Sequence, residues 1–142
     1  KNVVAWTAMI KSYVENYQID EARKLFHEMP QRNLYSWNIM IQACLDDGYR
    51  VDEAIQLFNS MPERNAISWT TMVTGLARNR STELAREYFD QMPNKDIAAW
   101  NAMISAYADE GLMAEASELF SLMPERNIVS WNAMIDGYAR NG

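Results

Sequence analysis

Two sets of small polar side chains recur along the chain at fixed spacing and are its best candidates for binding chemistry. The post-tryptophan residues follow each tryptophan directly and contain only Thr and Asn: Thr7, Asn38, Thr70, Asn101 and Asn132. The closing residues lie four positions before each later tryptophan and contain only Asn and Asp: Asn33, Asn65, Asp96 and Asn127. Amides and hydroxyls both donate and accept hydrogen bonds, whereas an ionised Asp only accepts. Such a series suits the reading of base edges and would be an unusual surface for catalysis.

Each set also has a purely structural interpretation. Thr and Asn near a helix start can bond to the local backbone, and Asn and Asp are favoured helix N-caps. The spacing alone leaves the two interpretations of the post-tryptophan residues open, and it favours the cap for the closing residues.

The polar residues belong to an internal repeat. Met-Pro-Glu-Arg-Asn occurs at 61–65 and 123–127, with looser copies at 29–33 and 92–96. Counted from three residues before each tryptophan, the repeats are 3–33, 34–65, 66–96 and 97–127, with a partial fifth at 128–142. The second repeat is one residue longer, and we place its extra residue within 46–50.

Apolar side chains three or four residues apart predict two helices in every repeat. The first helix carries a stripe such as Val4, Trp6, Met9, Ile10 and Tyr13, and the second a stripe such as Ala22, Leu25, Phe26 and Met29. Gly48 and Gly111 stand where first helices would end, and a proline after each Met discourages the second helix from continuing. We therefore predict an all-α fold, a right-handed α-solenoid of stacked helix-turn-helix repeats. The tryptophans would be core, and the Glu and Arg of the motif a solvated linker.

Composition argues against several functional classes. The net charge is −6 and the pI about 4.8, so no basic field attracts nucleic acid. Cys44 and His27 are the only cysteine and histidine and recur in no other repeat, so we expect no metal site and no cofactor. No nucleophile–base pair is evident, and the motif of zinc deaminases is absent. The chain is not expected to be an enzyme. Its ends read as those of a piece excised from a longer array.

The last repeat has only its first helix. Its apolar side chains should therefore be partly uncovered: Trp131, Met134, Ile135 and Tyr138. We expect fraying or self-association through this end.

Four tandem copies of W-[NT]-x-M-[IV] with M-P-x-[RK]-[ND] resemble the pentatricopeptide repeat family, specifically the short 31-residue repeats of the plant organellar class with mixed repeat lengths. The resemblance covers essentially the whole chain. It implies single-stranded RNA binding, one base per repeat, read by a post-tryptophan residue together with its repeat's closing residue. The implied pairs are Thr7 with Asn33 for adenine, Asn38 with Asn65 for cytosine over uracil, Thr70 with Asp96 for guanine, and Asn101 with Asn127 for cytosine over uracil. The target would be 5′-A-C/U-G-C/U-3′, and Asn132 lacks a partner in this chain.

The resemblance also gives a role to the flanking residues, which stand two positions before each tryptophan and sandwich the bases: Val4, Tyr35, Ile67, Ala98 and Val129. Their structural alternative is core packing beneath the helix start. Tyr35 and Ala98 depart from the usual aliphatic type. Tyr35 would add stacking area or crowd the neighbouring base, and Ala98 would make only weak contact with its base.

The implied context is RNA processing in a plant mitochondrion or chloroplast by a nuclear-encoded factor. Recognition of C-to-U editing sites is the leading role, followed by splicing or transcript stabilisation. Editing-complex proteins or a deaminase domain outside this chain would be partners. The competing hypothesis is a tetratricopeptide-like protein-binding scaffold, which the acidic pI favours, although that family's period is 34 residues. Four bases give modest affinity, so we expect micromolar or weaker binding.

Overall fold

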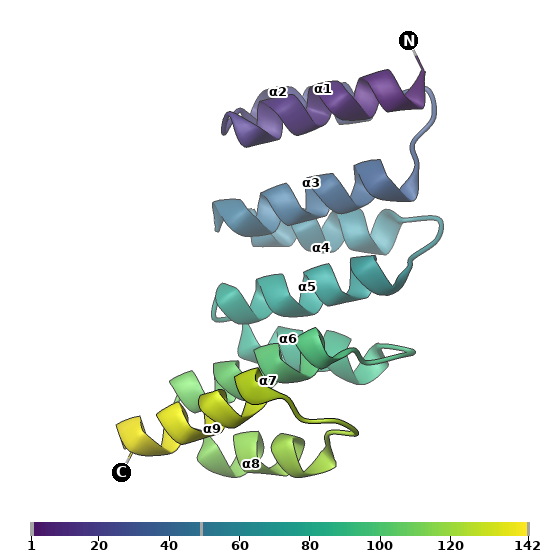
Figure 1. The fold of residues 1–142 in the computed structure, drawn as a ribbon. Coiled ribbons are helices and arrows are strands. Elements are labelled where there is room, and N and C mark those ends of the chain that lie inside the picture. Colours follow the sequence, from purple (N-terminus) through teal and green to yellow (C-terminus); the bar gives the residue numbers. More distant parts are fainter. Residues whose placement is uncertain (1, 49, 142) are drawn as a thin grey trace. The chain divides into compact units, whose positions relative to one another are not determined.

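The computed structural model describes residues 2–48 and 50–141, which form nine helices and no strand (Figure 1). The helices are α1 (Val3–Glu15), α2 (Ile19–Glu28), α3 (Leu34–Asp47), α4 (Val51–Ser60), α5 (Ala66–Arg78), α6 (Thr82–Gln91), α7 (Ile97–Asp109), α8 (Met113–Leu122) and α9 (Ile128–Asn141). The chain divides into two compact units, Lys1–Met72 and Val73–Gly142, with the boundary inside α5. Within the described residues, no helix has the length and apolarity needed to cross a membrane.

Each unit is built from helical hairpins. In the first, α1 packs on α2, α3 packs on α4, and α3 also contacts α1 and α2. In the second, α7 contacts α6, α8 and α9. The buried stripes are largely the predicted ones, since Phe26, Met40, Ile41 and Phe58 of the first unit and Met103 and Ile104 of the second are almost inaccessible to solvent. The all-α repeat fold is therefore confirmed.

Local sequence sets where these helices begin and end. Asn2, Asn33 and Asp96 cap α1, α3 and α7 through their side-chain oxygens. The second helices are each followed directly by a methionine with an extended ψ angle of 125 to 130°: Met29, Met61, Met92 and Met123. That conformation is the one the following proline imposes on the residue before it.

Three of the tryptophans, which we predicted to be core residues, lie at the edge of the core. Trp37, Trp69 and Trp100 are half-buried, and each meets edge-on the phenylalanine of the preceding helix, with ring centroids 4.9 Å apart. Edge-to-face packing of this kind is a favoured aromatic geometry. Val4, predicted on the first apolar stripe, is 75% exposed.

The last helix exposes most of the side chains that we expected to be uncovered. Trp131, Ile135 and Tyr138 are each more than half exposed, whereas Ile104, equivalent to Ile135, is fully buried. The prediction is wrong for Met134, which is 6% exposed, because it lies on the side of α9 that packs against α7 and α8.

The arginine of the repeated motif is structural, so the prediction of a merely solvated linker is wrong for it. Arg32 donates from Nε to the Phe26 carbonyl (2.7 Å) and from an Nη to the His27 carbonyl (3.0 Å). Its guanidinium also lies 4.7 Å from the centre of the Phe26 ring. Arg64 and Arg126 repeat this arrangement over Phe58 and Phe120. These arginines therefore satisfy carbonyls at the C-termini of α2, α4 and α8 and cover the aromatic pair.

Replacing Arg32 with methionine should cost about 1–2 kcal/mol of unfolding free energy, because the side chain keeps its length but loses the carbonyl bonds and the cation–π contact. Urea denaturation measures the loss. Glu125→Gln is the control, since Glu125 is exposed in the equivalent linker between α8 and α9, and it should change stability by less than about 0.5 kcal/mol. Equal losses of unfolding free energy in Arg32→Met and Glu125→Gln would contradict the structural role of Arg32.

The turn inside each repeat needs a left-handed residue. Gly48 and Gly111 supply it at φ of 77° and 78°, and the equivalent positions hold Tyr17 and Arg80, both at φ of 61°. A side chain in this region is strained by about 1–2 kcal/mol relative to glycine. The expected helix ends at Gly48 and Gly111 are thus confirmed, and the other repeats tolerate strain at the same point.

Replacing Tyr17 with glycine should stabilise the chain by up to about 1 kcal/mol, because strain is relieved and a side chain that is 91% exposed loses little packing. The reciprocal change Gly111→Ala should destabilise, since its φ is positive and its Cβ would stand 3.0 Å from Asn141 Oδ1. Thermal unfolding of the two variants checks the opposite signs. A loss of stability in Tyr17→Gly would contradict the prediction.

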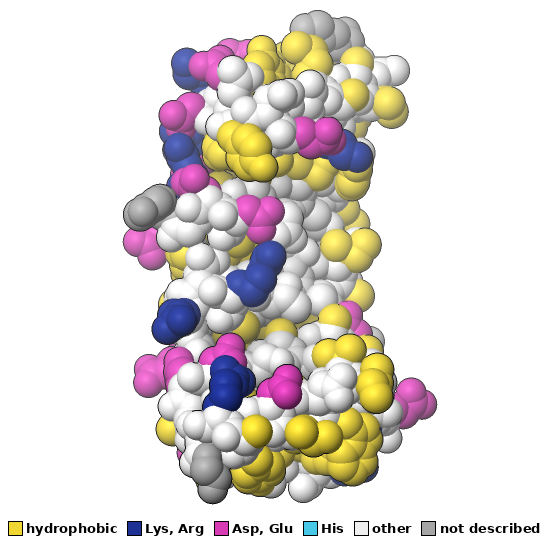
Figure 2. Space-filling model, turned by 60° about the vertical axis from the view of Figure 1, so that its left-hand side comes forward, with side chains coloured by type: hydrophobic (Ala, Val, Ile, Leu, Met, Phe, Trp, Pro, Cys, Tyr) yellow, Lys and Arg dark blue, Asp and Glu magenta, His cyan; other side chains and the backbone are white. Residues whose placement is uncertain are grey.

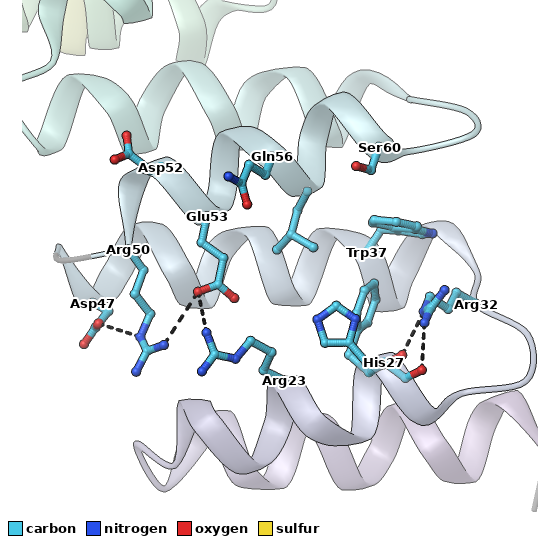
Figure 3. A pocket seen from close by; sticks show the side chains of 12 residues that line it. Arg23, His27, Arg32, Trp37, Asp47, Arg50, Asp52, Glu53, Gln56 and Ser60 are labelled. Carbon is cyan, nitrogen blue, oxygen red and sulfur yellow. Dashed lines mark hydrogen bonds and ion pairs between the residues drawn. The ribbon is translucent and has the colours of Figure 1, made fainter.

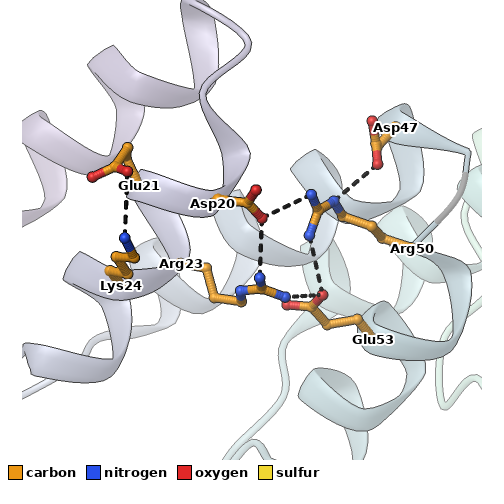
Figure 4. Close-up of polar contacts among 7 residues, drawn as sticks. All are labelled: Asp20, Glu21, Arg23, Lys24, Asp47, Arg50 and Glu53. Atoms are coloured by element: carbon orange, nitrogen blue, oxygen red, sulfur yellow. Dashed lines mark hydrogen bonds and ion pairs between the residues drawn. The ribbon is translucent and has the colours of Figure 1, made fainter.

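A cluster of ion pairs joins α2 to the start of α4 (Figure 4). Arg23 bridges Asp20 and Glu53, at 3.0 and 2.8 Å, while Arg50 bridges Asp20 and Asp47, at 2.8 and 2.9 Å. These pairs link two second helices at the surface. Beneath them Cys44 is fully buried, and burial raises the pKa of its thiol to about 12. The thiol is therefore protonated at neutral pH and acts as a small core side chain.

Candidate nucleic-acid interface

Two of the predicted pairs meet in the structure. Asn38 donates from Nδ2 to Asn65 Oδ1 at 3.4 Å, and Asn101 donates from Nδ2 to Asn127 Oδ1 at 3.3 Å. Both distances are at the long end of the hydrogen-bonding range. Each bond joins the start of one first helix to the cap of the next first helix. The two positions are therefore adjacent across the repeat junction, although 26 or 27 residues separate them in sequence.

The closing residues are N-caps, as their structural interpretation predicted. Their Oδ1 atoms accept the backbone N–H three residues on: Ser36 for Asn33 (2.8 Å), Ser68 for Asn65 (3.0 Å), Ala99 for Asp96 (2.9 Å) and Ser130 for Asn127 (3.0 Å). This bond fixes the orientation of the side chain. In an Asn it commits the oxygen to the helix and leaves the NH₂ as the group for other partners. In an Asp the second group is another acceptor oxygen.

The post-tryptophan residues vary in burial and in partners. Thr7 and Asn38 are buried, Thr70 and Asn101 are half-buried, and Asn132 is exposed. Asn38 and Asn101 bond across the junction, which disfavours the local-backbone interpretation for them. Thr7 is not joined to Asn33, because Thr7 Oγ1 is buried without a hydrogen-bond partner. Thr70 belongs to the first compact unit and Asp96 to the second.

The flanking residues form a series of exposed apolar side chains. Val4 is 75% exposed, Tyr35 53%, Ile67 62% and Val129 53%, and Ala98 is also exposed. The core-packing alternative is therefore wrong for all five. Exposed apolar side chains of this kind are available for contact with a ligand.

In the first unit these residues line a groove of about 560 Å³ along the first helices. Tyr35 and Ile67 line it together with the amides of Asn38 and Asn65, and its surface is mostly apolar. Sequence reasoning missed six other lining residues: Lys11, Val14, Leu34, Ile39, Gln42 and Thr71. A detectable signal existed for two of them. Lys11 and Gln42 stand four residues after Thr7 and Asn38, so they share the same face of their helices.

A larger cleft of about 900 Å³ lies on the second helices, between α2 and α4 (Figure 3). Its charged side chains are largely paired with one another, since Arg23 and Arg50 hold Glu53 and Arg50 also holds Asp47 (Figure 3). It contains none of the repeated polar or flanking residues. The first-helix groove is therefore the better candidate site.

Charge gives the surface little long-range attraction for phosphate. On the face seen in Figure 2, acidic and basic side chains are interspersed. Glu15, Asp46 and Asp109 are exposed near the ends of first helices, and Arg78 is the basic exception at that position. Binding at this site would depend on short-range contacts with bases.

The fold and the site define a class: a protein of stacked helical hairpins whose first helices carry hydrogen-bonding pairs at the junctions. Family comparison assigns residues 1–35 to the PPR repeat family and residues 35–65, 67–97, 98–128 and 129–142 to the PPR repeat. The chain belongs to the pentatricopeptide repeat family.

Two individual relatives match only part of the chain. The pentatricopeptide repeat-containing proteins At1g03540 and At4g39530 of Arabidopsis thaliana are each 34% identical to it, over 44 and 55 residues. These matches cover 31% and 32% of this chain and 7% of each relative.

Solved structures share the fold at low identity. The pentatricopeptide repeat protein PPR10 from maize superposes on 98% of this chain with a TM-score of 0.89 and 15% identity. PPR10 in complex with an 18-nt psaJ RNA element superposes on 99% with a TM-score of 0.82 and 17% identity. The chain spans 22–23% of the length of PPR10.

Proposed function

We propose that this chain binds single-stranded RNA in a sequence-specific way, one base per repeat, with the preference 5′-A-C/U-G-C/U-3′. The observation that carries the proposal is the arrangement in the first unit, where Asn38 and Asn65 meet between the exposed side chains of Tyr35 and Ile67 in one groove. Apolar side chains supply stacking surface, and the amides supply edge contacts. The RNA complex of PPR10, a protein of the same family and fold, supports RNA as the ligand.

The caps provide a chemical basis for the code. Because Asn65 and Asn127 commit their oxygens to the helix, they offer N–H donors outward, which suits the O2 acceptor that cytosine and uracil share. Asp96 instead carries a second acceptor oxygen, which suits the N1–H and N2–H₂ donors of guanine. The RNA would run with its 5′ end at the first repeat.

The proposed biological role is organellar RNA processing in a plant, with C-to-U editing-site recognition first. The family and the two Arabidopsis relatives support a plant setting. The chain would act by binding, and deamination would come from a domain or protein outside it. Its alternative role as a protein-binding scaffold draws on the acidic pI of about 4.8.

A gel-shift comparison at low salt tests the proposal. An RNA containing ACGC should bind with about tenfold higher affinity than one containing ACAC, since one base edge contact is worth about 1–3 kcal/mol. We expect micromolar or weaker dissociation constants. Equal binding of both RNAs would refute the base assignment while keeping RNA binding, and no binding of either would favour the protein-binding role.

We also propose that the chain self-associates through α9. Its support is the exposure of Trp131, Ile135 and Tyr138 on one helix. Size-exclusion chromatography over a range of concentrations should show an oligomer that Ile135→Asp abolishes. A monomer at every concentration would refute it.

A further inference from the structure

From the second repeat onward, the third residue of each first helix is a small side chain buried at the repeat junction. It is serine at Ser36, Ser68 and Ser130 and alanine at Ala99, and all four are fully buried. Each serine lies beside the closing residue of the previous repeat, because its N–H bonds to that residue and its Oγ accepts the same residue's N–H. The serine oxygen therefore completes a capping box, and its single hydroxyl proton remains to be donated elsewhere.

The three serines donate that proton differently. Ser36 and Ser130 donate to the backbone carbonyls of Asn33 and Asn127, both at 2.8 Å. Ser68 turns across the junction instead. Its Oγ lies 2.7 Å from Asn38 Oδ1 and 2.9 Å from Asn65 Oδ1, and the bond to Asn38 is buried. Since one proton serves one acceptor at a time, the shorter contact assigns it to Asn38.

This bond changes what the Asn38–Asn65 pair offers to a ligand. Asn38 Oδ1 is held by Ser68 and Asn65 Oδ1 by the helix cap, so both carbonyl oxygens are committed. The remaining side-chain groups are N–H donors. In the second pair Asn101 Oδ1 is buried and has no hydrogen-bond partner. That amide is held through the bond from its Nδ2 to Asn127 Oδ1, and its oxygen lacks the second bond that Ser68 gives to Asn38.

The geometry points to Ser68 as a positioning residue that makes the second repeat a stricter reader of its base than the fourth, although both repeats carry the same Asn–Asn pair. This inference rests on the proposed RNA-binding function. Ser68 would not touch the base itself. It would hold Asn38 so that donors face a pyrimidine and no acceptor is presented to the N6–H₂ group of adenine.

Binding of RNAs that differ at one base tests the inference, with the whole chain and fluorescence anisotropy as the measurement. Wild-type protein should prefer ACGC over AAGC, altered at the second base, by about tenfold. It should prefer ACGC over ACGA, altered at the fourth base, by only about threefold. Ser68→Ala should lower the second-base ratio to about threefold, while Ser130→Ala should leave the fourth-base ratio unchanged.

Ser130→Ala is the matched control because it removes the same capping hydroxyl but no bond to a post-tryptophan residue. If Ser68 had a merely structural role, Ser68→Ala would weaken the binding of all RNAs equally and leave the ratios of their affinities unchanged. A wild-type second-base ratio that survives Ser68→Ala would overturn the inference and keep the proposed function. Failure of wild-type protein to bind or to discriminate any RNA would overturn the proposed function, and the inference with it.

Discussion

Replacing Asp96 with asparagine is expected to reverse the preference at the third base from guanine to adenine. In the proposed code the carboxylate would accept from the guanine donors, whereas the capped amide would offer an N–H to an acceptor such as adenine N1. If each base edge contact contributes about 1.4 kcal/mol of discrimination, the ratio of ACGC to ACAC affinity changes by about a hundredfold. A gel shift with the two RNAs measures it.

The substitution should leave the fold intact, because Asn and Asp are comparable N-caps and Asp96 bonds the Ala99 N–H through one oxygen that an amide also possesses. RNAs altered at the second base serve as the control and should keep their rank in wild-type and variant protein. A uniform loss of affinity for all RNAs would mean that Asp96 contributes to binding without reading the base.

Replacing Phe58 with alanine should cost about 3–5 kcal/mol, the largest loss of stability that we expect from a single change. Its ring is 1% exposed and lies 4.9 Å from the ring centre of Trp69, with the Arg64 guanidinium 4.6 Å from its own centre. Truncation removes the buried ring and leaves both neighbours without their contact. A loss of this size is a large fraction of the 5–15 kcal/mol typical of a folded domain.

Phe120→Ala is the matched control, because Phe120 makes the equivalent contacts with Trp131 and Arg126 but is only half-buried. It should cost roughly half as much, since less apolar surface is withdrawn from water there. Urea denaturation followed by tryptophan fluorescence gives both values. Equal losses would mean that burial does not govern the contribution of this ring.

The sequence by itself determined the repeat architecture. A stripe of apolar residues at helical spacing, an Asn or Asp before each first helix and a proline after each second helix are local signals, and local signals fix helix boundaries. They predicted the hairpins and the caps at Asn33 and Asp96. They also made Asn38 and Asn65 a candidate pair, though only through the resemblance to a family.

Tertiary structure decided how those residues act. Burial of Ile104 but not of Ile135 depends on which helix packs next to each, which no residue within a repeat encodes. The role of Arg32 depends on a carbonyl and a ring brought within reach by the turn at the proline. Whether Ser68 bonds to its own cap or to Asn38 depends on the approach of two helices 30 residues apart. Repetition thus predicts the fold, while contacts between repeats decide what each repeat presents to a ligand.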